Sequence, residues 1–465
     1  MNHRVESDLL GTISLPENVF YGVQTWRASQ NFNLSGTHLN HFPYLIQALA
    51  MVKQAAARAN NQLGNLTKEK SDIIEKACQK VINGDFNQYF IVDMIQGGAG
   101  TSTNMNANEV IANVGLEIMG KSLGDYQYLH PNNDVNMSQS TNDAYPTAVR
   151  IAVLLSHDEL VNSLRKLKNS FSLKAKEFDK IIKMGRTQLQ DAVPMTLGQE
   201  FQSWESTLGE DIQRITGLSE LLKEVNLGGT AIGTGINASI SYSKIAVKEL
   251  SSISNLPLVI ASDLVEASSD MGAFVLFSSM LKRLAVKLSK IANDLRLLSM
   301  GPRAGLSEIN LPAQQPGSSI MPGKVNPVIP EAVNQVAYQV IGNDLTVTMA
   351  AEAGQLQLNA MEPLIVFNIL ESIRLLTKAM DMFREYCIDG ITANIDVCMG
   401  HVKNSVGIIT VLNPIIGYEN STRIAKHALM SGESVIDLIR AENLLTEIQI
   451  NELLSPESMC GILKH

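Results

Sequence analysis

The chain has 465 residues, of which 45% are hydrophobic and 18% are charged, and its net charge at pH 7 is −9. This composition is typical of a globular protein and excludes a disordered chain. The acidic balance excludes a basic surface for nucleic acid or for an anionic membrane. The first residues, MNHRVESDLLGT, lack a basic segment followed by an apolar one, so we expect no signal peptide. No apolar run reaches the roughly 18 residues of a membrane-spanning helix. We therefore expect a cytoplasmic protein of about three domains.

The residues up to 142 mix helical stretches with loops rich in Gly and Asn, and we expect them to form an N-terminal domain. Two of these loops are dense in hydroxyl and amide side chains. They are GGAGTSTNMNANE at 97–109 and MSQSTNDAYPT at 137–147.

Two long segments between residues 143 and 395 carry apolar residues at alternating spacings of three and four. The first runs through Phe277, Leu281, Leu284, Leu288, Ile291, Leu295 and Leu298. The second runs through Val366, Ile369, Ile373, Leu376, Met380, Phe383 and Cys387. This repeat keeps one apolar stripe facing the neighbouring helices, which then pack at shallow angles. We predict an all-α fold, with a central bundle of long helices at 143–395 and a small C-terminal helical domain at 396–465.

The four cysteines, Cys78, Cys387, Cys398 and Cys460, have no CxxC spacing. We expect reduced thiols, and neither a zinc site nor a disulfide framework.

Two glycine-rich stretches differ from the nucleotide-binding motifs that they superficially match. In GSSIMPGKV at 317–325, five residues separate the glycines and Val325 follows Lys324, whereas a P-loop has four residues and then Ser or Thr. GGTAIGTG at 228–235 lacks GxGxxG spacing, and we expect a helix over about 210–225 before it, where a dinucleotide fold has a strand. We exclude both nucleotide interpretations.

Two further polar loops lie within the predicted bundle, GRTQLQDAVPMTLGQE at 185–200 and GSSIMPGKVNP at 317–327. Helix caps and turns favour the same residue types, so one such loop alone carries little weight. Four loops together indicate a site, because hydroxyls and amides donate to carboxylate oxygens and Lys324 supplies a cation for a second carboxylate. None of the four loops contains a histidine, and they carry no metal-ligand cluster. We predict a site for a small dicarboxylate, with Ser318 or Ser319 as a candidate base.

Six motifs occur in an order that resembles the fumarase/aspartase superfamily over nearly the whole chain. They are GTSTNMNANE, QSTNDAYPT, GRTQLQDAVPMTLGQE, GPRAGLSEINLP, GSSIMPGKVNP and AAEAGQLQLN. Members of this superfamily cleave C–N or C–O bonds and release fumarate. The resemblance implies an all-α homotetramer with a central bundle of long helices. It also implies active sites built from loops of three different subunits.

Three details are similar to the members that deaminate L-aspartate: YGVQTWRA near the N-terminus, STN at 140–142 and GRTQ at 185–188. The resemblance therefore implies reversible deamination of L-aspartate to fumarate and ammonia, with no cofactor and no metal. The alternative is a fumarate hydratase that interconverts malate and fumarate. Ammonia leaves without a general acid, whereas hydroxide needs one, and the amide of Gln188 cannot titrate.

The resemblance also implies roles for individual residues. Ser318 matches the general base, on a loop that closes over the substrate. Lys324 and Asn326 match the groups that hold the α-carboxylate. The matching donors to the β-carboxylate are Thr101, Ser140, Thr141 and Ser319. The matching residues of the amino-group pocket are Asn142, Thr187 and Gln188. Fumarases carry His at position 188, so no histidine relay is expected here, and for Glu331, which matches the carboxylate of that relay, we expect a structural role.

Overall fold

The computed structural model describes residues 2–459. Most of these residues are helical, which confirms the all-α prediction, and the strands form only four two-stranded pairs. The chain forms two compact units. Unit 1 comprises Met1–Val161, Arg214–Arg283 and Gln339–Leu376, and unit 2 comprises Asn162–Gln213, Leu284–Tyr338 and Thr377–His465. The three-part division at residues 142 and 395 stays a prediction.

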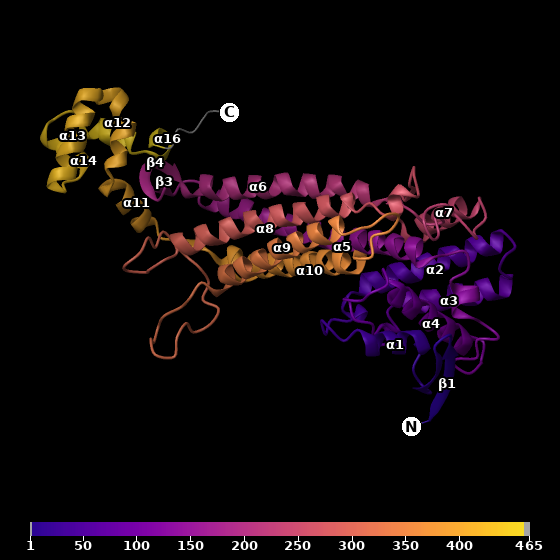
Figure 1. Cartoon of the computed structure of the whole chain (residues 1–465). Helices are drawn as coiled ribbons and strands as arrows, with labels where there is room; N and C mark the ends of the chain where they lie inside the picture. Colours follow the sequence, from indigo (N-terminus) through magenta and orange to yellow (C-terminus); the bar gives the residue numbers. More distant parts are fainter. Residues whose placement is uncertain (1, 460–465) are drawn as a thin grey trace. The chain divides into compact units, whose positions relative to one another are not determined.

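Unit 1 begins with an antiparallel hairpin of β1 (His3–Asp8) and β2 (Gly11–Pro16). Its shorter helices are α1 (Val23–Asn31), α2 (Pro43–Gln62), α3 (Lys68–Ile82), α4 (Thr101–Ile118) and α7 (Tyr242–Ser254). Helices α2, α3 and α4 pack together beside α1 at the N-terminal end of the chain (Figure 1). Most of α2 and α4 is buried because both are rich in small and apolar residues.

The expected helix over about 210–225 is wrong in its last part. Helix α6 ends at Leu218, and a 3₁₀ helix continues over Ser219–Leu222. A parallel pair of two-residue strands, β5 (Glu224–Val225) and β6 (Val259–Ile260), then replaces the last expected residues. The backbone of Ala261 donates to Val225, so a partner 36 residues further along the chain decides this strand. Such non-local pairing overrides the local helical pattern.

Five long helices make up the bundle: α5 (Thr141–Glu177), α6 (Leu197–Leu218), α8 (Gly272–Leu298), α9 (Val328–Glu352) and α10 (Glu362–Tyr386). All fourteen residues of the two predicted apolar stripes are buried, which confirms those stripes. Pro330 lies in the first turn of α9, where its missing N–H leaves no hydrogen bond unmade.

Segments of these helices pack against each other within each unit. In unit 2, the ring of Phe171 on α5 lies 5.8 Å from that of Trp204 on α6 and 6.4 Å from that of Phe383 on α10. In unit 1, Ser278 on α8 donates to Asp344 on α9 at 2.8 Å. Aromatic packing and buried polar contacts therefore hold neighbouring helices in register.

Unit 2 also holds the C-terminal helices and two antiparallel strand pairs. The helices are α11 (Ile395–Asn404), α12 (Ile409–Ile416), α13 (Tyr418–Ser431), α14 (Val435–Ala441), α15 (Glu447–Leu453) and α16 (Pro456–Met459). The antiparallel pairs are β3 (Ile182–Thr187) with β4 (Gln190–Thr196), and β7 (Ile309–Asn310) with β8 (Thr392–Ala393). Ile182 and Met184 of β3 belong to the apolar core of the C-terminal helices.

Within residues 2–459, no single helix combines the length and apolar composition needed to cross a bilayer. The bent pair Ile395–Asn404 and Val406–Ile416, broken by 73°, meets that test only when both pieces are counted together. Four of its residues, Val402, Ile408, Leu412 and Ile416, lie in the core of unit 2, as is usual for the core helices of a globular domain.

Three cysteines, Cys78, Cys387 and Cys398, are buried free thiols, and burial raises the pKa of each. Cys460 lies outside the described residues.

Candidate active site

The predicted site residues fall into one group in unit 1 and two segments in unit 2. In unit 1, Thr101 begins α4, whereas Ser140, Thr141 and Asn142 form the turn that opens α5. Asn104 connects them, because it lies one turn after Thr101 and its Nδ2 donates to Thr141 Oγ1 at 3.2 Å. The structure thus brings the Ser140–Asn142 turn against the first turn of α4.

The buried carboxylate of Asp143 fixes the Ser140–Asn142 turn by hydrogen bonds to backbone N–H groups. Its carboxylate accepts from the backbone N–H of Ser140 at 2.9 Å, of Gly228 at 2.9 Å and of Thr230 at 3.0 Å. Burial raises the pKa of Asp143 to about 6, and these backbone donors oppose the shift. Asp143 therefore joins the turn to the glycine-rich segment at 228–235, which serves as structural support rather than as a nucleotide cradle.

Asn142 makes contacts with the same segment. Its Nδ2 donates to Ala231 O at 2.8 Å, and its own backbone carbonyl accepts from Asn226 Nδ2 at 3.0 Å. The N–H side of the Asn142 amide is thus engaged, and its Oδ1 is the atom suited to accept from a substrate amino group.

A buried lysine lies next to this group. Lys53 Nζ donates to Asn104 Oδ1 at 2.6 Å, to Asn136 Oδ1 at 2.9 Å and to Gln139 Oε1 at 2.9 Å. Burial lowers the pKa of Lys53 to about 7, and the negative charge of Asp143 opposes this shift. All three N–H donors of the ammonium are satisfied by amide oxygens, so a positive charge can be held beside the Ser140–Asn142 turn.

In unit 2, Thr187 and Gln188 lie at the tip of the β3–β4 hairpin and are exposed. Gln188 has φ of 54° and Leu189 has φ of 61°, as a two-residue type I′ turn requires. Asn and Gly usually occupy such turns, and each larger residue in this conformation costs about 1–2 kcal/mol. The segment that the sequence presented as a polar loop is therefore a hairpin with a strained turn.

The segment 311–327 between β7 and α9 projects as a loop (Figure 1). Gly317 N donates to Lys324 O at 2.8 Å, and Asn326 Nδ2 donates to Gly317 O at 3.0 Å, which closes the loop at its base. A Cβ at Gly317 would lie 2.5 Å from Lys324 O, so the closure requires glycine. Ser318 Oγ accepts from Ile320 N–H at 3.3 Å. Ser319 and Lys324 are exposed.

Between residues 2 and 459, no hydrogen bond or ion pair joins Thr187 or Gln188 to the 317–327 loop. In the first turn of α9, Glu331 Oε1 lies 4.0 Å from Arg296 Nη2. The roles of the predicted site residues stay predictions.

The sequence interpretation missed the polar side chains beneath the Ser140–Asn142 turn: Lys53, Asn104, Asn136 and Gln139. One signal was present, since Lys53 stands in the run LAMVKQAAA, where a lone charge among small apolar residues indicates a buried cation with specific partners.

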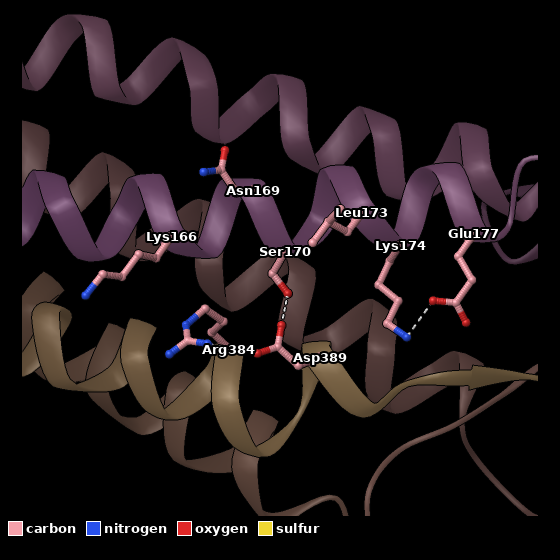
Figure 2. Close-up of a pocket in the computed structure, with 8 residues that line it drawn as sticks. All are labelled: Lys166, Asn169, Ser170, Leu173, Lys174, Glu177, Arg384 and Asp389. Atoms are coloured by element: carbon pink, nitrogen blue, oxygen red, sulfur yellow. Dashed lines mark hydrogen bonds and ion pairs between the residues drawn. The ribbon is translucent and has the colours of Figure 1, made fainter.

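A surface cavity of about 660 Å³ in unit 2 contains none of the predicted site residues. Figure 2 shows Lys166, Ser170, Lys174 and Glu177 along α5, facing Arg384 and Asp389. Lys174 pairs with Glu177 at 2.8 Å, Arg384 pairs with Asp389 at 2.9 Å, and Ser170 donates to Asp389. Because these charges largely satisfy each other, we assign this cavity no part in the chemistry. The part of the chain that the structure describes contains no group of three or more His, Cys, Asp or Glu placed to hold a metal ion.

Comparison with known proteins decides the family. A lyase family model matches residues 11–342, and a fumarase C C-terminus model matches residues 408–461. Aspartate ammonia-lyase from Pseudomonas aeruginosa is 66% identical over 98% of this chain and 96% of its own length. The chain belongs to the fumarase/aspartase family of lyases.

Two solved structures share the fumarase/aspartase fold with this chain. A fumarate lyase described as delta crystallin, from Brucella melitensis, superposes with a TM-score of 0.95 at 58% identity, covering 98% of this chain and 99% of its own. A class II fumarase from Schistosoma mansoni superposes with a TM-score of 0.92 at 35% identity, with the same two coverages. These values confirm the predicted family and its central helical bundle.

Proposed function

We propose that this chain catalyses the reversible deamination of L-aspartate to fumarate and ammonia. The observation that carries the proposal is the 66% identity to an aspartate ammonia-lyase over 98% of the chain. The hydroxyl, amide and lysine side chains described above supply the chemistry that a small dicarboxylate needs.

The difficult step is removal of a β-proton from aspartate. The product of that step is an aci-carboxylate dianion, whose charge is concentrated on two oxygens. Hydroxyl donors aimed at these oxygens stabilise it selectively, and loss of one such donor typically lowers the rate about 100- to 1,000-fold. We assign this role to Thr101, Ser140, Thr141 and Ser319. The ammonium form of Lys53, held close to Thr141 through Asn104, adds a positive charge below its pKa of about 7.

We assign the general base to Ser318. A serine hydroxyl is normally too weak a base, so its alkoxide must be favoured by N–H donors and by nearby positive charge. The N–H of Ile320 already donates to Ser318 Oγ, and Lys324 lies on the same closed loop. The loop's exposure fits a segment that opens for substrate entry and closes to exclude water. In this scheme Lys324 and Asn326 hold the α-carboxylate.

We assign the amino-group pocket to Asn142, Thr187 and Gln188. Amide oxygens accept hydrogen bonds from an ammonium group without changing charge near neutral pH. Ammonia leaves without a general acid, so the absence of a titratable group at position 188 suits an amine. Fumarate hydration is the second candidate, because the class II fumarase has the same fold at 35% identity. Its leaving hydroxide would need an acid that Gln188 cannot provide.

We further propose that the chain acts in the cytoplasm as a homotetramer whose active sites combine loops of several subunits. An apolar stripe on α9 supports this, because Tyr338, Leu345 and Met349 are 60%, 62% and 66% exposed in the single chain. Exposed apolar side chains along one face of a long helix are typical of a subunit interface.

Following the ultraviolet absorbance of fumarate with L-aspartate or L-malate as substrate tests the proposed function. Fumarate and ammonia formed together from L-aspartate support it. Fumarate formed from L-malate alone would replace it with fumarate hydration.

A further inference from the structure

A buried carboxylate lies behind the hairpin that carries Gln188. Glu308 is fully buried, and its Oε1 accepts from Arg186 Nη1 at 2.7 Å, whereas its Oε2 lies 3.0 Å from Lys183 Nζ. His401 Nδ1, from α11, lies 3.0 Å from Oε1. The two cations lower the pKa of Glu308 against the effect of burial, so the carboxylate is ionised. One anion thus pairs with two cations of strand β3, and Lys183 Nζ also donates to Glu200 Oε2 at 2.5 Å.

The hairpin is shaped so that Arg186 reaches this anion. The register of β3 against β4 shifts between Met184 and Arg186, because two residues of β4, Ala192 and Val193, lie opposite the single residue Gly185 of β3 as a β-bulge. A Cβ at Gly185 would lie 2.8 Å from Val193 O, so the bulge in β4 needs glycine at the facing position of β3. Bulges commonly re-aim a side chain beside an active site. Here the first pair beyond the bulge is Arg186 with Asp191, and Thr187 and Gln188 follow Arg186.

The turn beyond Arg186 needs such an anchor. Gln188 and Leu189 both have positive φ, a conformation that non-glycine residues keep only where the surroundings impose it. The apolar side of the stem is fixed by Ile182 and Met184 in the core of the C-terminal helices. The polar side is fixed by Lys183 and Arg186 on Glu308.

Stability alone does not explain this cluster. A buried ion pair is often no more stabilising than well-packed apolar residues of the same volume, because both charges lose their hydration. The buried charges of Lys183, Arg186 and Glu308 instead specify one geometry for the base of the turn.

We propose that Glu308 is a positioning residue for the reaction: it holds Arg186 and Lys183 so that the strained turn presents Gln188 to the substrate amino group. The inference deepens the proposed function and rests on it. Glu308 itself touches no substrate and acts through the hairpin.

A double-mutant cycle on kcat/KM for L-aspartate tests the role of Glu308. In the unmodified protein, Gln188→Ala should lower kcat/KM about 10- to 100-fold, as expected for a lost hydrogen bond to a charged group. In a Glu308→Gln background the same change should cost no more than about 3-fold, because Gln188 is already misplaced. If Glu308 made only a structural contact, Gln188→Ala would lower kcat/KM by the same factor with and without Glu308→Gln.

The matched control is Asp344→Asn. Asp344 is also a buried carboxylate paired with a lysine, since Lys282 Nζ lies 2.5 Å from its Oδ2. Its carboxylate also accepts from Ser278 and Ser279, which, like Lys282, lie on α8 outside the predicted site segments. In this background the penalty of Gln188→Ala should equal that in the unmodified protein. If the Glu308→Gln chain does not fold, Arg186→Lys takes its place, because lysine keeps the charge and loses the rigid guanidinium fork.

Equal penalties of Gln188→Ala with and without Glu308→Gln, within about 2-fold, would overturn the inference. If the unmodified protein releases no ammonia from L-aspartate, the proposed function fails, and hydrogen exchange decides the positioning separately. Faster amide exchange at residues 186–190 in Glu308→Gln than in Asp344→Asn would then support the anchoring of the turn. Unchanged exchange there would refute it.

Discussion

The carboxylate of Asp143 accepts a hydrogen bond from the backbone N–H of Gly228 at 2.9 Å, which joins two segments 85 residues apart. The same carboxylate also accepts from Ser140 N–H, and so it holds the turn that carries Ser140, Thr141 and Asn142. The polar groups expected to bind substrate therefore depend on a side chain that lies beneath them.

Replacing Asp143 with Asn should lower kcat about 10- to 100-fold, because asparagine has one acceptor oxygen for three backbone donors and places an NH₂ against another. Steady-state rates of fumarate formation from L-aspartate measure the effect. Asp72→Asn is the control, since Asp72 pairs with Lys68 on an exposed face of α3 and should keep full activity. Equal rates for the two variants would show that Asp143 does not set the turn.

Ser318→Ala should nearly abolish turnover while leaving the fold and substrate binding intact, since the hydroxyl acts only in the transition state. Single-turnover rates together with fumarate binding measure both parts. Ser431→Ala, at an exposed serine of α13 whose hydroxyl donates to His427 O, is the control. Retention of a tenth or more of the unmodified rate would remove Ser318 from its role as base.

L-malate should be a negligible substrate. A pocket built to hydrogen-bond one group discriminates against an analogue that leaves its polar groups unpaired. The difference in kcat/KM is commonly about 10⁴-fold or more. Gln188→His alone should not create a fumarase, because Asn142, Thr141 and Thr187 still shape the pocket for an amine. Initial rates with both substrates, for both proteins, check this. Malate dehydration at a rate comparable to aspartate deamination in the unmodified protein would favour fumarase.

Sites shared between subunits should allow complementation. Ser318→Ala chains and Thr187→Ala chains, each inactive alone, should regain some activity after they are unfolded together and refolded as mixed tetramers. Some sites then take every loop from an intact copy. Each variant refolded with itself is the control. Mixed tetramers that form and remain inactive would indicate sites made within one chain.

Glu362 should make stability depend on pH. This carboxyl is buried at the start of α10, and burial raises its pKa from 4.5 to about 8, although the positive charge of Arg150 opposes the shift. The folded state therefore binds a proton that the unfolded state releases, so the contribution of this group is complete below about pH 4.5 and is lost as the pH rises through about 8. Thermal unfolding should be measured from pH 5 to pH 9. As the pH rises, the melting temperature of Glu362→Gln should increase relative to that of the unmodified protein.

The matched control for this measurement is Glu69→Gln, at an exposed residue in the first turn of α3. A difference between Glu362→Gln and the unmodified protein that does not vary with pH would mean that Glu362 stays ionised beside Arg150 throughout the range.

The long helices of this protein were determined by its sequence, because a helix makes its hydrogen bonds within one segment and its buried face repeats at a fixed spacing. The residues from Phe277 to Leu298 and from Val366 to Cys387 that were predicted to face a core are all buried. The family was also determined by the sequence, since motifs of consecutive residues carry it. The same motifs brought Ser140–Asn142 and the 317–327 loop to attention as candidate site segments.

Other features were decided only by the tertiary structure. The hairpin at 182–196 has no Asn or Gly in its turn, and its bulge at Ala192 and Val193 breaks the alternation of apolar residues by which a strand is recognised. Lys53 is buried because three amide oxygens, from residues 51 to 86 positions away, meet at its ammonium group. Glu308 finds Arg186 and Lys183 more than 120 residues earlier in the chain. Burial of a charge depends on partners that the folded chain assembles from distant segments, and no local pattern of residues encodes that meeting.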